Sequence, residues 1–166
     1  MKRYKDSMNI GLAGEYMVAG MLSIQGWYSS LTLKNYPDVD IIACKVGEED
    51  RPKCIQVKST KGQSSILVGS LKRDATEEDV KKDIVKGDYV FVVFPKKIDE
   101  DPTIHPDYYV VPKADMIELV IKTNNDYFNK PHKKEVKEVQ PIAIKVADLK
   151  QYKDRWDLLK LLPPIK

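Results

Sequence analysis

The sequence predicts an α/β fold, with helices on both faces of a mixed central sheet. Residues 7–25 carry apolar side chains at helical spacing and are followed by a glycine, as is typical of a helix. Residues 39–46 and 54–59 are apolar segments separated by a turn, which indicates two paired strands. Residues 88–94 are apolar on both faces, which is typical of a central strand covered by helices. The order helix, three strands, helix, strand, then strand and helices predicts a three-layer α/β/α sandwich.

The first helix is expected over residues 7–25. Ser7 is a plausible N-cap, and Gly26 follows the helix as a C′ residue. Glu15 is the only charged residue in the segment, and its neighbours one turn away are small or apolar. A carboxylate in such surroundings is costly unless a positive group pairs with it. Glu15 therefore either reaches water or a surface lysine at the rim of the helix, or belongs to a functional site.

Three strands are expected next, over residues 27–33, residues 39–46 and the segment around residues 54–59. If residues 47–51 turn the chain, the second and third strands pair antiparallel. The register expected from this turn has three opposed pairs: Asp40 with Lys58, Ile42 with Gln56, and Cys44 with Cys54. Because side chains alternate along a strand, all six lie on one face. Directly opposed side chains are about 5 Å apart at Cβ.

The remaining elements complete the sandwich. Thr76 is expected to cap a helix over residues 76–86, with Asp79 at the capping-box position. The other expected elements are a short strand or the start of a loop over residues 66–71, a charged loop over 95–106, an edge strand over 108–111, a helix over 112–122 with Pro112 at N1, an irregular polar segment over 124–140, and a final helix over 147–162.

Asp40, Gln56 and Lys58 are polar residues within two apolar strands. A structural protein gains little from a carboxylate, an amide and an ammonium clustered there, because buried polar groups need partners. A metal site that faces phosphate would use all three. Simpler interpretations also exist. Asp40 could cap a turn or strand, although Asp38 suits that role better because it follows a proline, and Lys58 could end a strand with its head in solvent.

The chain resembles the PD-(D/E)xK nuclease superfamily, with its restriction-endonuclease-like fold, in three segments: Gly14-Glu15, Pro37-Asp38-Val39-Asp40 and Gln56-Val57-Lys58. The resemblance is to small prokaryotic branches and is concentrated in the first third of the chain. Gln56 stands where most members carry Glu or Asp, so the motif is a QxK variant. The D…(E/Q)xK pattern alone is degenerate, and its specificity comes from its combination with the helix glutamate and the strand context.

The resemblance implies roles for four candidate catalytic residues. Asp40 would be the metal-binding aspartate, Lys58 the catalytic lysine, and Glu15 the helix glutamate that some branches add to the metal site. Gln56 would be a neutral metal ligand through its side-chain carbonyl. Mg²⁺ is the expected cofactor, with Mn²⁺ as an alternative, because hard cations prefer oxygen ligands. The implied activity is metal-dependent hydrolysis of phosphodiester bonds in nucleic acid, with DNA as the expected substrate.

Length and composition agree with this interpretation without establishing it. Residues 1–166 are expected to form a single nuclease-like domain with its own core. The sequence shows neither a bilayer-spanning apolar run nor a secretory h-region, so a cytoplasmic protein without a membrane partner is expected. The net charge is only +3, so nucleic-acid binding would need a local basic rim. The candidates for this rim, each more often a solvated surface residue, are Lys61, Lys72, Arg73, Lys81, Lys82, Lys133 and Lys134.

Two other functional classes are compatible with the sequence. The chain could be a nucleic-acid-binding or protein-interaction module that kept the fold while Gln56 weakened the site. It could instead be an assembly protein in which the polar cluster is a buried salt bridge. A homodimer is one option for the nuclease, since a compact domain with one site often dimerises to cut both strands. Cys44 and Cys54 are expected to be reduced core thiols and not a disulfide.

Overall fold

The computed structural model describes residues 2–32, 39–98, 100–101, 103, 105–132 and 137–159. With η denoting a 3₁₀ helix, the elements in chain order are α1 (Lys2–Ile24), β1 (Trp27–Leu31), β2 (Ile41–Lys45), β3 (Glu48–Lys61), β4 (Ser65–Lys72), α2 (Glu77–Asp83), β5 (Asp88–Phe94), β6 (Asp107–Val111), α3 (Lys113–Phe128), β7 (Val139–Lys145), η1 (Val146–Tyr152) and η2 (Trp156–Leu159).

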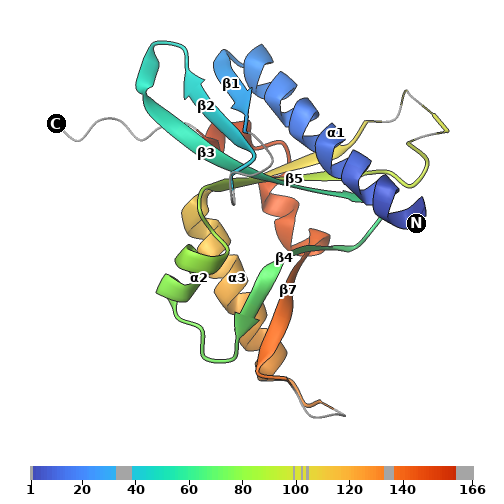
Figure 1. Ribbon diagram of the computed structural model, residues 1–166, viewed down its shortest axis with the longest axis vertical. Coiled ribbons are helices and arrows are strands. Elements are labelled where there is room, and N and C mark those ends of the chain that lie inside the picture. The colour runs from blue at the N-terminus through green and yellow to red at the C-terminus, as the bar shows by residue number, and fades with distance from the viewer. Residues whose placement is uncertain are drawn as a thin grey trace.

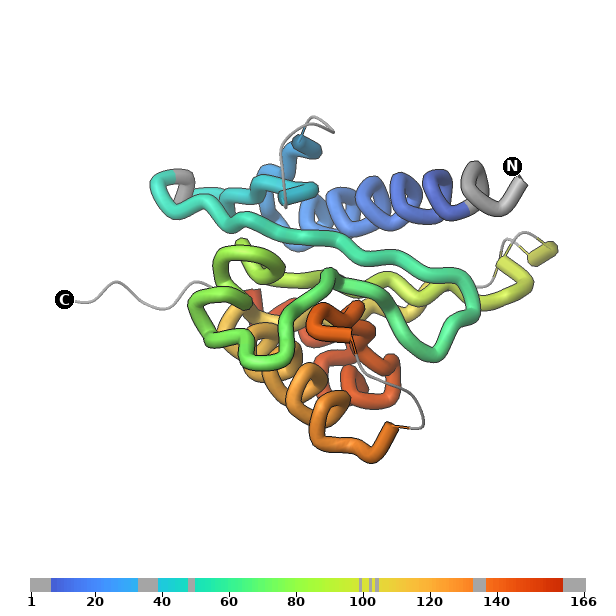
Figure 2. Tube along the Cα trace, turned by 60° about the horizontal axis from the view of Figure 1, so that its bottom comes forward, coloured from blue at the N-terminus to red at the C-terminus, as the bar shows by residue number. Residues whose placement is uncertain are grey.

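A five-stranded mixed sheet forms the middle layer of the protein (Figure 1). Its strand order is β1-β2-β3-β5-β6, in which β3 and β5 are parallel and the other neighbouring strands are antiparallel. Figures 1 and 2 show α1 along one face of this sheet, with α2, α3 and the β4–β7 pair on the other. The prediction of an α/β/α sandwich around a mixed sheet is therefore confirmed. The two-stranded β4–β7 sheet adds to one outer layer.

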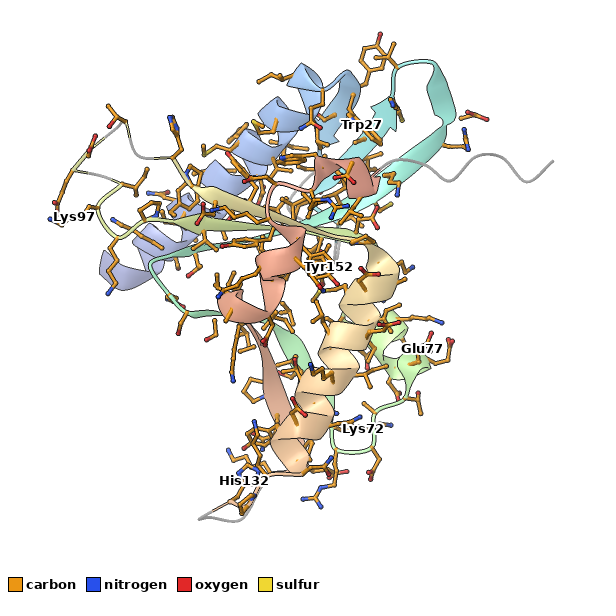
Figure 3. All side chains as sticks on the ribbon, turned by 180° about the vertical axis from the view of Figure 1, so that it is seen from behind. Trp27, Lys72, Glu77, Lys97, His132 and Tyr152 are labelled. Atoms are coloured by element: carbon orange, nitrogen blue, oxygen red, sulfur yellow. The ribbon has the colours of Figure 1, made fainter. Side chains whose placement is uncertain are left out.

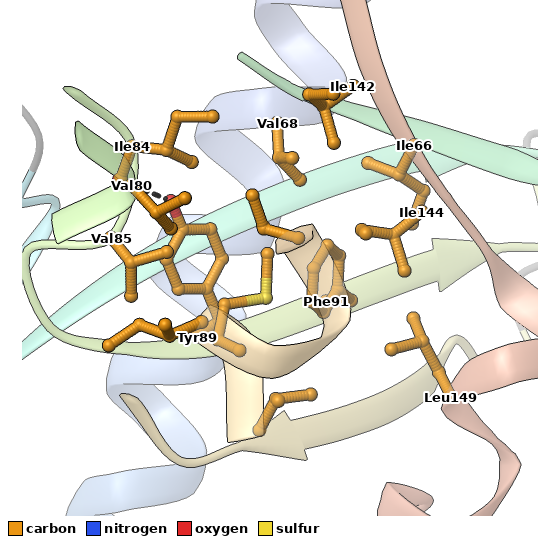
Figure 4. Packing of buried hydrophobic residues seen from close by; sticks show 14 of the residues in the cluster. Ile66, Val68, Val80, Ile84, Val85, Tyr89, Phe91, Ile142, Ile144 and Leu149 are labelled. Atoms are coloured by element: carbon orange, nitrogen blue, oxygen red, sulfur yellow. Dashed lines mark hydrogen bonds between the residues drawn. The ribbon is translucent and has the colours of Figure 1, made fainter. Parts of the chain in front are cut away.

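Strand β5 shows why both faces of the sheet are covered. Val90 and Val92 belong to the apolar cluster under α1, whereas Tyr89 and Phe91 belong to the cluster on the other face. Figure 4 shows this second cluster, in which β4, α2, β7 and η1 supply the side chains around the two aromatic rings. The Tyr89 hydroxyl donates a hydrogen bond to the Ile84 carbonyl oxygen at 2.9 Å, so the polar group of this buried side chain has a partner.

Helix α1 begins at Lys2, so the prediction that Ser7 caps it is wrong. Residues 2–6 are mostly charged and have no apolar stripe, and periodicity therefore did not place them in the helix. The other end is confirmed. Gly26 has a φ of +82°, and its backbone N–H donates to the Ser23 carbonyl oxygen at 3.1 Å, as expected of a glycine that ends a helix.

The β2–β3 register differs from the prediction by two residues. Ile42 pairs with Cys54 and not with Gln56. A shift by an even number keeps every side chain on its expected face, since the strand period is two. It does change which residues are neighbours. Asp40 now comes beside Gln56, whereas the sequence analysis placed it opposite Lys58.

A tight turn causes the shift. Lys45 pairs with Glu48 across a two-residue connection, where a turn over residues 47–51 was expected. Gly47 in this connection has a φ of +86°, which a glycine adopts at little steric cost. An irregularity between Ala43 and Lys45 then restores the regular ladder further along the hairpin.

The two cysteines do not face each other. Cys44 pairs with Tyr28 of β1, whereas Cys54 pairs with Ile42. Both thiols are free, and Cys54 is exposed. The cysteines are unbridged, as expected, but they are not facing core residues, because the register shift separates them and Cys54 is exposed.

Helix α2 begins with the predicted capping box. The Asp79 N–H donates to the Thr76 hydroxyl at 3.2 Å, and the Thr76 N–H donates to the Asp79 carboxylate at 2.8 Å. The Thr76 hydroxyl also donates to this carboxylate, at 2.8 Å. The two hydrogen bonds that Thr76 donates lower the pKa of Asp79, because they stabilise its charged form.

Helix α3 continues to Phe128, well past the predicted end at residue 122. Asn124 explains the error, because its polarity suggested an irregular segment although the residue is buried. Its side-chain amide donates to the carbonyl oxygens of Lys72 at 3.0 Å and Arg73 at 3.3 Å, and so fastens α3 to the end of β4. Strand β7, part of which falls in the segment predicted to be irregular, pairs with the same β4.

The final helix expected over residues 147–162 is replaced by η1 and η2, and residues 160–162 lie outside the described part of the chain. Asp154 separates the two 3₁₀ helices, with a φ of 55°, and its N–H donates to the Tyr108 carbonyl oxygen at 2.9 Å. The apolar residues of the segment are still used for packing. Tyr152, the last residue of η1, packs in the cluster that α3 also lines (Figure 3), and the Trp156 ring is 5.4 Å from the ring of Tyr108.

Asp88 joins three elements at the start of β5. One carboxylate oxygen accepts a hydrogen bond from the Lys53 ammonium of β3 at 2.9 Å. The other accepts from the Lys113 backbone N–H, at the first residue of α3, at 2.8 Å. The Asp88 side chain is only 10 % exposed, so this ion pair is largely withdrawn from water. Loss of one partner would leave the other charge poorly compensated.

We therefore expect Asp88→Ala to lower the free energy of unfolding by about 3 kcal/mol. Asp107→Ala is the matched control, because Asp107 also contacts a lysine, Lys153, at 2.7 Å but is 47 % exposed. The control should change stability by less than about 1 kcal/mol. Urea unfolding of both variants measures the difference, and equal losses would contradict the role assigned to the buried pair.

Candidate functional site

Asp40 lies where β2 separates from β3. Its backbone N–H donates to the Ile55 carbonyl oxygen at 3.0 Å. Its carboxylate oxygen Oδ2 then accepts two hydrogen bonds at 2.7 Å, one from the Val57 N–H and one from the Gln56 side-chain amide. The carboxylate thus takes the place of a further strand residue in the ladder. Asp40 is held by backbone as well as side-chain contacts at the end of the hairpin.

Beyond this point, no strand in the described part of the chain pairs with β3 on the β2 side, and we call this stretch of β3 its open edge. Among the described residues, the pairing of β2 with β3 ends at Ile55. The N–H of Val57 points toward Asp40, and the carbonyl of the same residue points to the same side of the strand. The Ile55 carbonyl already accepts from Asp40, so Val57 is the better placed of the two backbone oxygens for a ligand at this edge.

Gln56 holds Asp40 through its amide nitrogen. The side chain is 8 % exposed, and its Nε2 group, not its oxygen, faces the Asp40 carboxylate. This orientation follows from chemistry, because an ionised carboxylate can only accept hydrogen bonds. If Gln56 were to coordinate the same cation as Asp40, its terminal amide would have to turn over. In the orientation observed, the amide nitrogen of Gln56 holds the Asp40 carboxylate in position.

Glu15 follows Gly14, the residue at which α1 packs closely against β3. A Cβ added to Gly14 would lie 1.8 Å from the Ser59 hydroxyl oxygen, so only glycine allows this approach of helix and strand. Glu15, half-buried in α1, and Lys58, half-buried in β3, are the chain neighbours of this contact. Of the four candidate site residues, Asp40 and Gln56 are in direct contact. Glu15 and Lys58 both adjoin this contact between α1 and β3.

The two faces of β3 are used differently. Ile55 and Val57 pack in the cluster under α1. Lys58 is opposite Phe91 in the parallel pairing with β5, and Phe91 belongs to the cluster on the other face. Glu15 and Lys58 therefore start from opposite sides of the sheet.

A pocket of about 360 Å³ lies at this open edge. Helix α1 contributes Ser7 and Ile10, β3 contributes residues 58–61, and Ile66 and Leu67 of β4 form a further wall. Lys58 is thus a member of the site and also a lining residue of the pocket. Sequence analysis did not find the apolar wall, because Ile66 and Leu67 come from a strand whose position depends on tertiary contacts.

The predicted basic rim is represented in this pocket by Lys61. The other candidates that the structure describes lie elsewhere. Lys72 contacts Asp79 at 3.6 Å, and Lys81 contacts Glu77 at 2.7 Å. The Arg73 guanidinium stacks over the ring of Phe128, 5.1 Å from its centre. Lys82 is exposed on α2, and residues 133–134 lie outside the described part of the chain, as do Pro37 and Asp38 of the motif.

Within the described ranges, no cluster of three His, Cys, Asp or Glu side chains could hold a metal ion. A cation beside Asp40 would therefore depend largely on neutral oxygens and water. Mg²⁺ suits such a donor set, because it commonly keeps several waters and binds through one or two carboxylates. In the same described part of the chain, no helix is both long and apolar enough to cross a bilayer.

Comparison with known proteins gives limited similarity. No model of a known protein family matches the sequence, and no curated protein matches it. Among solved structures, one similar chain is Hjc, a Holliday junction resolvase from the archaeal hyperthermophile Archaeoglobus fulgidus. The TM-score is 0.47 and the sequence identity 11 %, with 92 % of this chain and 98 % of the resolvase chain covered. Function is therefore inferred from the side chains of this chain and their geometry.

The close approach at Gly14 gives a direct test of the site's framework. We expect Gly14→Ala to lower the free energy of unfolding by about 1–3 kcal/mol, because the new methyl group would overlap the Ser59 hydroxyl. Gly11→Ala is the matched control, since a Cβ at that position of the same helix has no heavy atom within 4 Å. The control should be neutral or stabilising by up to about 1 kcal/mol.

Thermal or urea unfolding of the two variants makes this comparison. Adding Ser59→Ala to the Gly14→Ala variant should recover part of the loss, because it removes the overlapping oxygen. A Gly14→Ala protein as stable as the Gly11→Ala protein would show that α1 does not pack against β3 at this point.

Proposed function

We propose that this protein is a metal-dependent nuclease that hydrolyses phosphodiester bonds, with DNA as the expected substrate. One observation carries the proposal. The Asp40 carboxylate is fixed by Gln56 and Val57 of β3. Lys58, the next residue of the same strand, lines a pocket. The residue pattern of the PD-(D/E)xK superfamily supports the same function. The order of helices and strands also agrees with the fold that this resemblance implies.

The residues at the open edge fit a hard divalent cation. Asp40 and Glu15 would supply two carboxylates, and the Val57 carbonyl would supply a neutral oxygen. Mg²⁺ is the expected ion, with Mn²⁺ as the alternative. When bound, such an ion polarises the phosphoryl group and lowers the pKa of a coordinated water. Gln56 would either turn its amide oxygen toward the ion or keep its present role and orient Asp40.

Lys58 is proposed to act on the phosphate. Its ammonium is a compact charge on a flexible stem, so it can follow the phosphoryl oxygens as negative charge develops on them. It can also orient the attacking water. In the overall reaction, the oxygen of water bonds to phosphorus, the bond to the leaving oxygen breaks, and that oxygen receives a proton.

A second function is supported by Gln56. A neutral amide donates to Asp40 where most superfamily members carry a second acid, so Asp40 has a hydrogen-bond donor with no cation present. This arrangement suits a module that binds nucleic acid or protein and has lost catalysis. Cleavage and metal-binding measurements separate the two functions, because the module would bind its partner without hydrolysis.

For the nuclease, we expect Lys58→Ala to reduce turnover about 10²–10³-fold while leaving folding and metal binding nearly intact. The physical reason is that the ammonium stabilises charge mainly in the transition state. Lys122→Ala, an exposed lysine of α3, is the control and should cleave at the wild-type rate. Gel assays with labelled DNA in Mg²⁺ or Mn²⁺ measure the rates. Unchanged cleavage by the Lys58 variant, or no cleavage by the wild type, would contradict the proposed role.

Gln56→Glu distinguishes a metal site from a metal-free polar cluster, because the two predict opposite changes in the stability of the protein when metal is added. If Asp40 and Glu15 hold a cation, a third carboxylate should tighten binding and increase the rise in melting temperature with added Mg²⁺. Without a cation, the new carboxylate would lie against Asp40, and repulsion would raise the pKa of one of them. The variant would then be less stable at neutral pH and recover as pH falls below that raised pKa.

Melting curves with and without Mg²⁺ or Mn²⁺ decide between these signs. Gln25→Glu, which adds the same charge at an exposed position after α1, is the control and should show no added metal dependence. A Gln56→Glu protein that melts below the wild type even at saturating metal would count against a metal site at this edge.

A further inference from the structure

We propose that the pocket beside Lys58 receives one unpaired nucleotide of the substrate. The preferred substrate would then carry a single-stranded or extruded nucleotide next to the bond that is cut. This inference rests on the proposed nuclease function, because it concerns what the same site binds. It adds a substrate class, namely nucleic acid with an unpaired segment as opposed to continuous duplex.

The position of the pocket supports this inference. It is built around the part of β3 that β2 leaves uncovered, with α1 on one side and β4 on the other. Lys58 belongs both to its lining and to the residue set that would act on phosphate. A strand whose phosphate lies at Lys58 would therefore place an adjoining nucleotide at the mouth of the pocket.

The chemistry of the lining suits a nucleotide. Lys58 and Lys61 supply positive charge for phosphate, and the Thr60 side chain supplies a polar group in a residue that is 6 % exposed. Ile66 and Leu67 supply an apolar wall, and Leu67 is 60 % exposed although it is a large apolar residue. A free phosphate would make no use of that wall, and a wholly apolar ligand would place no negative charge beside the Lys58 ammonium. A nucleotide has both an anionic phosphate and a flat base that packs on apolar side chains.

The pocket also selects against paired bases. Its volume of about 360 Å³ is within the range of roughly 300–1,000 Å³ usual for small-molecule sites. A base within a duplex is stacked on both faces and cannot enter a concave pocket unless it is extruded. Ends, flaps, gaps and branches contain bases that are already unpaired, so entry from these structures needs little or no unstacking energy.

Leu67→Ala tests the pocket without removing a core side chain, because Leu67 is exposed and belongs to neither apolar cluster. Binding is measured by fluorescence anisotropy in EDTA, which prevents cleavage, with a labelled duplex and the same duplex carrying a single-stranded flap. The wild type should bind the flap substrate roughly tenfold more tightly, since packing of one base on a protein side chain is worth about 1–3 kcal/mol. Leu67→Ala should lose most of this preference and bind the paired duplex as before.

Two controls complete the experiment. Val139→Ala removes a side chain of similar exposure, 54 %, from β7 at a position outside the pocket, and should keep the wild-type preference. Leu67→Met retains an apolar wall and should also keep it. Equal binding of both substrates by the wild type, or an equal loss for both substrates in Leu67→Ala, would overturn the inference.

Cleavage in Mg²⁺ or Mn²⁺ separates this inference from the proposed function. A protein that cuts duplex and flap equally would be a nuclease whose pocket does not select unpaired nucleotides. A flap preference that depends on Leu67, in a protein that cuts neither substrate, would support the pocket and overturn the nuclease.

Discussion

The parallel pairing of β3 with β5 is the constraint on which the rest of the structure depends. It joins Ile55 through Lys61 to Asp88 through Phe94, so β4 and α2 must cross one face of the sheet before the chain returns. That crossing places β4 where β7 can pair with it, and it builds the apolar cluster opposite α1. The Asp88 carboxylate then connects β3, β5 and α3 at one end of the same pairing.

The proposed function depends on the part of β3 that does not pair with β2. β3 extends beyond the last residue that pairs with β2, and the Asp40 carboxylate replaces the missing backbone partner at Val57. In the proposed function, this carboxylate is already held in position by Gln56 and Val57. Preorganisation of this kind is what hydrolytic sites need, because groups already in position require no reorganisation during reaction.

The same edge carries features that stability alone would not favour. The Ser59 hydroxyl is buried and has no hydrogen-bond partner in the described part of the chain, and such an atom costs about 1–3 kcal/mol. Gly14 packs against this hydroxyl, and a larger residue there would overlap it. Both residues lie at the closest approach of α1 to β3, next to Glu15 and Lys58. Their coincidence with the predicted site residues agrees with a functional reason for this geometry.

The sequence by itself determined the features that depend on short stretches of chain. The two-faced apolar pattern of β5, the Thr76 capping box and the helix stop at Gly26 all follow from local periodicity and residue type. Tertiary structure alone decided the β2–β3 register, the pairing of β7 with β4, the buried role of Asn124 and the contact of Gly14 with Ser59. The physical reason is that periodicity records only which face of an element is apolar. Register, strand pairing and close approach are set by turn geometry and by contacts between residues far apart in the chain.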